Sequence, residues 1–256
     1  MVSIKNEKDI ECLRKAGKIV VDALNLARDN IRPGVDTLTL DKKAEKLISD
    51  SGARPAFKGY TVPGVPKPFP GTLCISINDE VVHGIPSEDR VLEEGDIVSI
   101  DVGVRIDGFY GDAAYTFPVG RISPEREALL KVTRECLERA ISVAREGATL
   151  GDVGHAVESW ATPRGYGIVR NYAGHGIGRN LHEAPQIPNF GVPGRGITLK
   201  KGMSLAIEPM IMTGKEEVRT LKDRWTVVTA DGSDAAHFEK TIVITGNDPE
   251  VITPWE

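Results

Sequence analysis

The sequence predicts an α+β fold in which two helix–helix–strand units, related by a pseudo-two-fold axis, surround a central antiparallel sheet. The first observation is an internal repeat: residues 92–101 and 199–208 both read Leu-x-x-Gly, a short strand, then Ile and a carboxylate. The second is that a pair of segments with helical spacing precedes each repeat. The third is a hairpin signal shortly after Asp101. In such a duplicated fold Asp101 and Glu208 face each other across the axis.

Smaller echoes support the repeat and follow the same order in both halves of the chain. Thr37-Leu38 followed by Ala44 in the first half matches Thr149-Leu150 followed by Ala156 in the second. His83-x-x-Pro86 likewise matches His182-x-x-Pro185. Any one of these matches could arise by chance, but three in order indicate a duplication.

Apolar residues at three- and four-residue steps predict four helices. The first spans residues 6–30 and stops before Pro33-Gly34, and the second spans 37–51. The third begins at Ser123-Pro124, a cap followed by proline at the first helical position, and lasts to Gly147. The fourth spans 149–161.

Between these helices the pattern predicts loops and short strands. Four prolines make residues 57–71 a loop, and apolar runs predict strands over 72–77 and 97–104. The chain after the fourth helix is a Gly/Pro-rich mixture of loop and strand. No long linker or low-complexity tract interrupts the chain, so we expect one domain over 1–256, with halves of about 1–120 and 121–256.

Composition excludes several classes of protein. A length of 256 residues allows one or two domains at ~150 residues each, and 40% hydrophobic with 27% charged residues is typical of a globular chain. A net charge of −5 argues against a nucleic-acid surface. No apolar run reaches the ~18 residues of a membrane span, and the N-terminus lacks the layout of a signal peptide. Three widely separated cysteines argue against a disulfide framework and for a reducing cytosol.

Two aspartates flank the hairpin signal Asp107-Gly108. With these residues at the turn, Asp112 lies opposite Gly103, on the same face as Asp101. A turn one residue earlier puts the two aspartates directly opposite each other, whereas a three-residue loop would separate them. Two solvated aspartates on an exposed face are the alternative. A shared divalent cation is favoured because Asp101 ends an apolar run, and a buried carboxylate needs a partner.

Three further segments carry chemistry. His175 lies between glycines in a Gly-x-Gly-x-Gly loop, Glu208 ends an apolar strand before Pro209, and Glu239 lies in another apolar strand. Glu208 or Glu239 alone is more typical of a structural salt-bridge partner, whereas His175 alone is about as typical of a structural residue as of a ligand. Together with the two aspartates they form four carboxylates and one imidazole, the oxygen-rich ligand set of a dinuclear divalent metal site that could activate a water molecule.

These five residues, in this order, resemble the metal ligands of type I methionine aminopeptidases, which have the pita-bread fold. The resemblance covers essentially the whole chain and is close to the short bacterial-style form. Only 31 residues separate Glu208 from Glu239, which leaves no room for the insertion of type II enzymes. The motifs that carry it are CISINDEVVHGIP, DIVSIDVG, FYGD, GHGIGR, AIEPM and FEKT.

The resemblance implies a role for each matching residue. Asp112 and Glu239 would bridge two divalent ions, Asp101 would complete one site, and His175 and Glu208 the other. Glu208 would also accept a proton from the water. His83 would lie near the substrate's free amine, and His182 would hydrogen-bond the scissile carbonyl. The methionine pocket would be lined by Tyr60, Phe69, Cys74, Leu181 and Trp225.

Some positions depart from the family pattern. Leu181 replaces a common Phe and Phe57 a common Cys, and the loop over residues 61–68 is longer than usual. Lys240 replaces a frequent His, but it should point to the strand face opposite Glu239.

The resemblance implies removal of the N-terminal methionine from nascent polypeptides whose second residue is small. It implies a cytoplasmic monomer that binds neither membrane nor nucleic acid directly, and it leaves contact with the ribosome open. Cobalt, manganese, iron or zinc would suit the ligands.

Two alternatives remain at this point. An Xaa-Pro aminopeptidase or prolidase uses the same five ligands but generally carries a sizeable domain ahead of the catalytic one. A non-catalytic pita-bread binding protein would have lost ligands, and all five are present here.

Overall fold

The computed structural model describes residues 2–255 and has the predicted α+β architecture. Its helices are α1 (Glu7–Asn30), α2 (Thr37–Asp50), α3 (Pro124–Val143) and α4 (Leu150–Ala161), followed by a 3₁₀ turn at Thr162–Arg164. Side chains of Asn6, Asp36, Ser123 and Thr149 cap the four N-termini. No helix among residues 2–255 is both long and apolar enough to cross a bilayer.

The predicted end of α3 is wrong. The helix stops at Val143 rather than Gly147, because Ala144 leaves the helical conformation (φ −76°, ψ 66°). Gly147 then adopts φ +89° and donates its backbone N–H to the carbonyl of Leu199 outside the helix. The residues between Val143 and Thr149 are therefore the turn into α4.

The strands pair in an antiparallel manner throughout. They are β1 (Arg54–Pro55), β2 (Leu73–Ile77), β3 (Glu80–Val82), β4 (Ile97–Ile106), β5 (Phe109–Pro118), β6 (Gly167–Ile168), β7 (Gly174–Gly176), β8 (Glu183–Ile187), β9 (Ser204–Ile207), β10 (Met210–Met212), β11 (Val218–Thr220), β12 (Val227–Thr229), β13 (Ala235–His237), β14 (Lys240–Val243) and β15 (Glu250–Val251). Four sheets result: β1-β4-β2 with β5 beside β4, β13-β10-β6, β11-β12-β3, and β15-β14-β9-β7-β8.

The hairpin β4–β5 has the register predicted from an Asp107-Gly108 turn. Gly103 pairs with Asp112 and Asp101 with Ala114. Asp101 and Asp112 therefore lie on one face of one ribbon, as side chains two residues apart must.

The second half contains a matching but interrupted ribbon. β9 pairs with β14 and β10 pairs with β13 in one continuous register, which places Glu208 opposite Glu239 where both strands are broken. Glu239 therefore lies between two strands, not within one as the sequence suggested. Pro209 explains the break, because proline cannot donate to a ladder.

The two ribbons meet along the pseudo-two-fold axis through a symmetric pair of threonines. The Thr116 hydroxyl accepts the backbone N–H of His237 and donates to its carbonyl, at 2.9 Å each. In the same way, the Thr241 hydroxyl accepts the backbone N–H of Asp112 at 3.3 Å and donates to the carbonyl of Asp112 at 2.8 Å. Between these contacts the backbone N–H of Glu239 donates to Ala114 at 2.8 Å.

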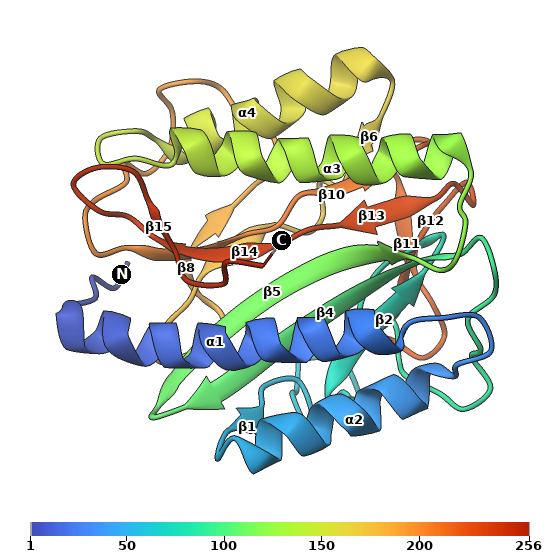
Figure 1. Ribbon diagram of the computed structural model, residues 1–256. Helices are drawn as coiled ribbons and strands as arrows, with labels where there is room; N and C mark the ends of the chain where they lie inside the picture. The colour runs from blue at the N-terminus through green and yellow to red at the C-terminus, as the bar shows by residue number, and fades with distance from the viewer. Residues whose placement is uncertain (1, 256) are drawn as a thin grey trace.

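Helices cover one side of the strands. In Figure 1, α1 and α3 cross the front of the strands in opposite directions, with α2 beside α1 and α4 beside α3. This antiparallel arrangement is what a two-fold axis between the halves requires. Isolated bridges from Asp36 to Val91 and from Thr149 to Thr198 repeat the same contact in each half.

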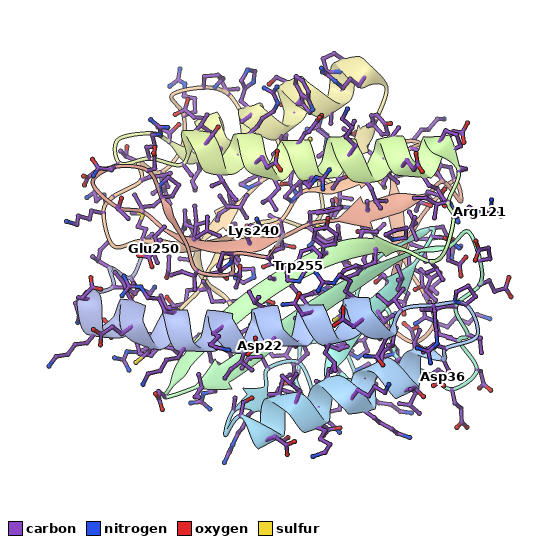
Figure 2. All side chains as sticks on the ribbon, in the orientation of Figure 1. Asp22, Asp36, Arg121, Lys240, Glu250 and Trp255 are labelled. Carbon is purple, nitrogen blue, oxygen red and sulfur yellow. The ribbon has the colours of Figure 1, made fainter. Side chains whose placement is uncertain are left out.

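Lys240 lies on this helical side. It lines a pocket together with Leu24, Leu137 and Trp255. Figure 2 shows Lys240 and Trp255 between the two front helices. The prediction that Lys240 points away from the site is therefore confirmed.

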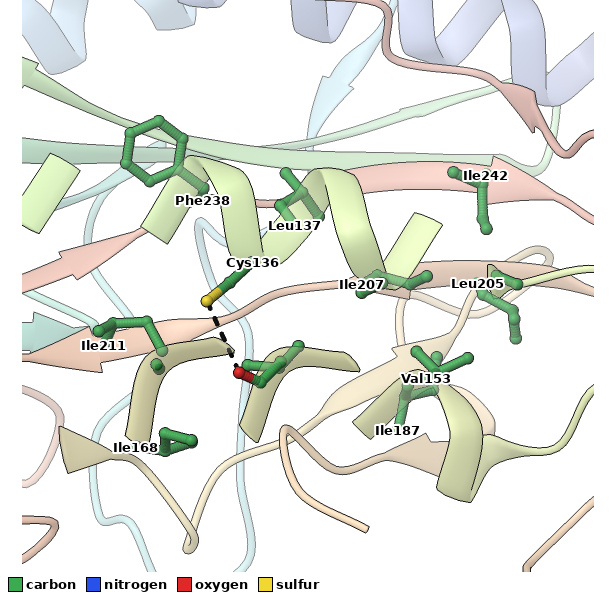
Figure 3. Close-up of a cluster of buried hydrophobic side chains, with 14 of the residues drawn as sticks. Cys136, Leu137, Val153, Ile168, Ile187, Leu205, Ile207, Ile211, Phe238 and Ile242 are labelled. Carbon is green, nitrogen blue, oxygen red and sulfur yellow. Dashed lines mark hydrogen bonds between the residues drawn. The ribbon is translucent and has the colours of Figure 1, made fainter. Parts of the chain in front are cut away.

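Each half has its own apolar core. In the second half α3 and α4 pack on the strands, and Leu137, Val153 and Phe238 are among the buried side chains of this core drawn in Figure 3. The buried Cys136 thiol points to the carbonyl of Val157 at 3.8 Å. Burial raises the pKa of this thiol to about 12, so it remains a neutral packing group.

Candidate active site

A cavity of about 620 Å³ brings the predicted residues together from both halves. Every site residue proposed from the sequence lines it: Tyr60, Phe69, Cys74, His83, Asp101, Asp112, His175, Leu181, His182, Glu208, Trp225 and Glu239. Phe57, Tyr172, Gln186 and His237 line it as well.

The four carboxylates enter from the two ribbons. Asp101 and Asp112 come from adjacent strands of the β4–β5 hairpin, and Glu208 and Glu239 from the facing breaks of the second ribbon. Asp112 and Glu239 are 3% and 4% exposed, which is unusual for carboxylates and indicates a partner.

His175 completes the cluster from the short strand β7. Its Nδ1 donates to the carbonyl of Gly176 at 2.9 Å, so the lone pair of the neutral ring is on Nε2. That atom lies 3.7 Å from Oε1 of Glu208 and 3.9 Å from Oδ2 of Asp112. A backbone carbonyl thereby holds the ring in the tautomer that a metal ligand needs.

The electrostatics of the cluster fit bound cations. Oδ1 of Asp101, Oδ1 of Asp112 and Oε1 of Glu239 are buried and accept no hydrogen bond from residues 2–255. Burial, followed by repulsion from neighbouring carboxylates, raises the pKa of Asp112 and of Glu239 well above the usual range. Ligand atoms of Asp112, His175 and Glu239 lie within 4.8 Å of one another. Hard oxygen donors with one imidazole suit first-row divalent ions.

Two further imidazoles flank the carboxylates. His83 has φ +61°, a strained conformation for a residue with a side chain, and burial lowers its pKa to about 4. The ring of His182 packs edge-on against that of His175, with 4.4 Å between the ring centroids. Nδ1 of His182 lies 2.7 Å from the Tyr60 hydroxyl. Desolvation, followed by electrostatic interaction with the His175 ring, lowers the pKa of His182 to about 4. Both rings are therefore neutral at pH 7.

An apolar slot adjoins the imidazoles within the same cavity. Phe57, Phe69, Cys74, Leu181 and Trp225 form one buried cluster, with Tyr60 packed against it. The Trp225 indole N–H donates to the carbonyl of Lys67 at 3.0 Å, and Phe69 contacts the ring edge-on. With its polar atom satisfied, the indole presents only apolar surface to the slot.

The N-terminal segment supports the loop that carries His182. Lys5 is 6% exposed and its ammonium contacts the carboxylate of Glu183 at 2.7 Å. The pair lies directly on Gly178, where a Cβ would come within 2.5 Å of the lysine Cε. A side chain at position 178 of the GHGIGR motif would therefore displace the end of the Lys5 side chain from this ion pair.

Sequence reasoning missed His237. Its side chain is 2% exposed, it lines the cavity, and its Nε2 lies 3.4 Å from Oε2 of Glu208. It precedes Glu239 by two residues, and residues two apart share a face of an extended chain, so this spacing could have identified it.

Comparisons with known proteins agree with this geometry. The model of metallopeptidase family M24 matches residues 11–246. The methionine aminopeptidase of Clostridium acetobutylicum is 49% identical over 256 residues, covering 100% of both chains. A crystal structure of methionine aminopeptidase from Thermotoga maritima has a TM-score of 0.95 at 46% identity, again covering 100% of both chains.

A prolidase from Pyrococcus furiosus shares the architecture at lower similarity. Its TM-score is 0.79 at 26% identity, and the match covers 99% of this chain but 66% of the prolidase. The expected pita-bread fold is confirmed by these neighbours. With the family match spanning most of its length and close relatives matching all of it, the chain belongs to metallopeptidase family M24.

Proposed function

We propose that this protein is a metal-dependent aminopeptidase that removes the N-terminal methionine from polypeptides whose second residue is small. The observation that carries the proposal is one cavity in which an apolar slot adjoins a cluster of carboxylates and imidazoles. Identity of 49% to a methionine aminopeptidase over the whole chain supports it.

The ligand set suits two divalent ions. Asp112 and Glu239, the most buried carboxylates of the cluster, would contact both ions, Asp101 would complete one site, and His175 with Glu208 the other. Such ions lower the pKa of water and polarise a carbonyl, which supplies the nucleophile and the electrophile of peptide hydrolysis. Cobalt, manganese, iron and zinc all suit these donors.

The remaining groups bind and orient the substrate. Neutral His83 is suited to accept a hydrogen bond from the free amine, and Glu208 to accept a proton from the attacking water. When the Tyr60 hydroxyl donates to Nδ1 of His182, the proton of that neutral ring is on Nε2, which then donates to the developing oxyanion.

The biological substrates we propose are the N-termini of nascent polypeptides. The enzyme would act on them in the cytosol, as a monomeric catalytic domain over residues 1–256. Contact with the ribosome would bring it to these substrates as they emerge.

A pair of tripeptides tests the proposed function. Met-Ala-Ser should be cleaved and Ala-Pro-Ala should not, with release of the first residue measured in the presence of each divalent metal. Cleavage of Ala-Pro-Ala instead would assign the protein to the Xaa-Pro peptidases that share its fold.

The apolar slot makes a prediction about the first and second residues. Norleucine should replace methionine well because it has a similar shape, whereas leucine should react slowly, since shape discriminates by only ~1–3 kcal/mol per methylene. Charged first residues should be excluded. Relative kcat/KM values for a peptide series measure this. Equal rates for Met-Lys and Met-Ala peptides would contradict a requirement for a small second residue.

Replacing His182 with alanine tests the oxyanion contact. We expect a folded protein that retains its metal and loses about 10²–10³ in kcat, with a much smaller change in KM, because the lost donor acts in the transition state. Steady-state kinetics and metal analysis measure both effects. A kcat within threefold of the wild type would make His182 a packing residue.

A further inference from the structure

We infer that His237 is a positioning residue for Glu208: its imidazole holds one carboxylate oxygen, so that the other is directed toward the metal ligands. The inference rests on the proposed function for its catalytic consequence, but not for its effect on metal binding. It concerns a side chain that the assigned roles leave without a task.

His237 is buried and chemically unsatisfied. Its side chain is 2% exposed, and Nε2 has no hydrogen-bond partner among residues 2–255. A buried polar atom without a partner destabilises the fold, so its presence in a cavity wall requires an explanation. An apolar residue would pack there at no such cost.

Glu208 is the group that this imidazole faces. Nε2 lies 3.4 Å from Oε2 of Glu208, and no other carboxylate among the described residues approaches this nitrogen as closely. Oε1 of the same carboxylate lies 3.7 Å from Nε2 of His175. The two oxygens of Glu208 are therefore divided between two imidazoles, and a shift of a few tenths of an ångström brings the His237 contact into hydrogen-bond range.

The backbone of His237 is held as firmly as that of a metal-ligand candidate. Thr116 binds its N–H and its carbonyl, just as Thr241 binds those of Asp112 across the pseudo-two-fold axis. His237 is thus the counterpart of Asp112 in the other half. We call the line along which Thr116 and Thr241 join the two ribbons the threonine seam. The side chains of His237 and Asp112 enter the cavity from this seam, and both threonines are fully buried.

Glu208 needs such a holder more than the other carboxylates do. It follows the last residue of β9, and its own carbonyl accepts a hydrogen bond from the Asn189 amide at 2.9 Å, which holds the main chain but not the side chain. A carboxylate with both oxygens free can rotate. With Oε2 held by His237, Oε1 alone remains for the ion that His175 would share.

Two substitutions separate positioning from packing. His237→Leu keeps the volume and removes the donor, whereas His237→Gln keeps an N–H donor at a similar distance along the side chain. His155→Leu, at an exposed position on α4, is the control and should match the wild type. Melting curves of the metal-free proteins verify that all variants fold.

The readouts are calorimetric titration with manganese chloride and steady-state hydrolysis of Met-Ala-Ser. For His237→Leu we expect the number of manganese ions bound per chain to be unchanged. We expect the affinity for the more weakly bound ion, or kcat, to fall about 10–100-fold, as is typical when a group that orients a metal ligand is lost. KM should change less than about threefold. His237→Gln should recover to within about threefold of the wild type in both measurements.

Two results would overturn the inference. A His237→Leu protein equal to the wild type in affinity and kcat would make His237 a packing residue. A folded His237→Gln protein as damaged as His237→Leu would show that the imidazole is itself a ligand, not a holder of Glu208. If the wild type binds manganese but does not cleave Met-Ala-Ser, the proposed function fails while the titration still decides the role of His237.

Discussion

An Asp112→Ala protein is expected to lose both of the proposed metal ions and about 10³-fold or more in turnover, because the proposed bridging carboxylate would belong to both coordination shells. Asp101→Ala should instead leave the site that contains His175 partly occupied. Metal analysis after gel filtration, together with kcat for Met-Ala-Ser, measures the difference.

The same variant should not destabilise the metal-free protein. Burial and repulsion from neighbouring carboxylates raise the pKa of Asp112 in the folded state, so this buried ionisable group opposes folding and its removal relieves that cost. Asp50→Ala, which removes an exposed carboxylate from α2, is the matched control. Two ions retained in the Asp112→Ala protein would disprove the bridging role.

Lys5→Met is expected to lower the free energy of unfolding by about 3–5 kcal/mol, because it leaves the largely buried charge of Glu183 without its opposite charge. Urea unfolding measures the loss. The double variant Lys5→Met/Glu183→Leu should regain most of it, since no buried charge remains. Lys18→Met, which breaks an exposed pair on α1, should change stability by less than about 0.5 kcal/mol.

The pH dependence of this pair has a definite sign. Burial alone would raise the pKa of Glu183, but hydrogen bonds from Lys5 and the Asn180 backbone bring it below the ordinary value. The stability it contributes is therefore present above the pKa of an unfolded glutamate, and it is lost as the pH falls through the folded value. A Lys5→Met protein within 1 kcal/mol of the wild type would contradict the importance of the pair.

Features with local causes could be predicted from the sequence. Helical spacing, with a cap recognised at Ser123-Pro124, placed the starts of all four helices within one residue. Asp107-Gly108 indicated the hairpin register that puts Asp101 and Asp112 on one face. The repeat correctly implied that Asp101 and Glu208 approach one cavity from opposite halves. Each of these depends on residues close together in the chain or on a visible duplication.

Features that depend on distant segments could not be predicted. Lys5 and Glu183 are 178 positions apart in the sequence, and the residues around each of them do not predict their ion pair. The turn after α3 depends on a hydrogen bond from Gly147 to Leu199, and the break around Glu239 depends on Pro209 in the facing strand. His237 looked like an ordinary strand residue because its partners, Thr116 and Glu208, come from other elements.

The threonine seam has a consequence for how this protein responds to its metal supply. Because the proposed ligands come from both halves, neither half alone presents the complete set, so bound cations would favour the folded chain over states in which one half is unfolded. By mass action, an ion at a hundredfold excess over its Kd adds about 2.7 kcal/mol to the free energy of global unfolding. The melting temperature should therefore rise with metal concentration. When metal is scarce, proteases should degrade the protein faster, and its activity should fall as well.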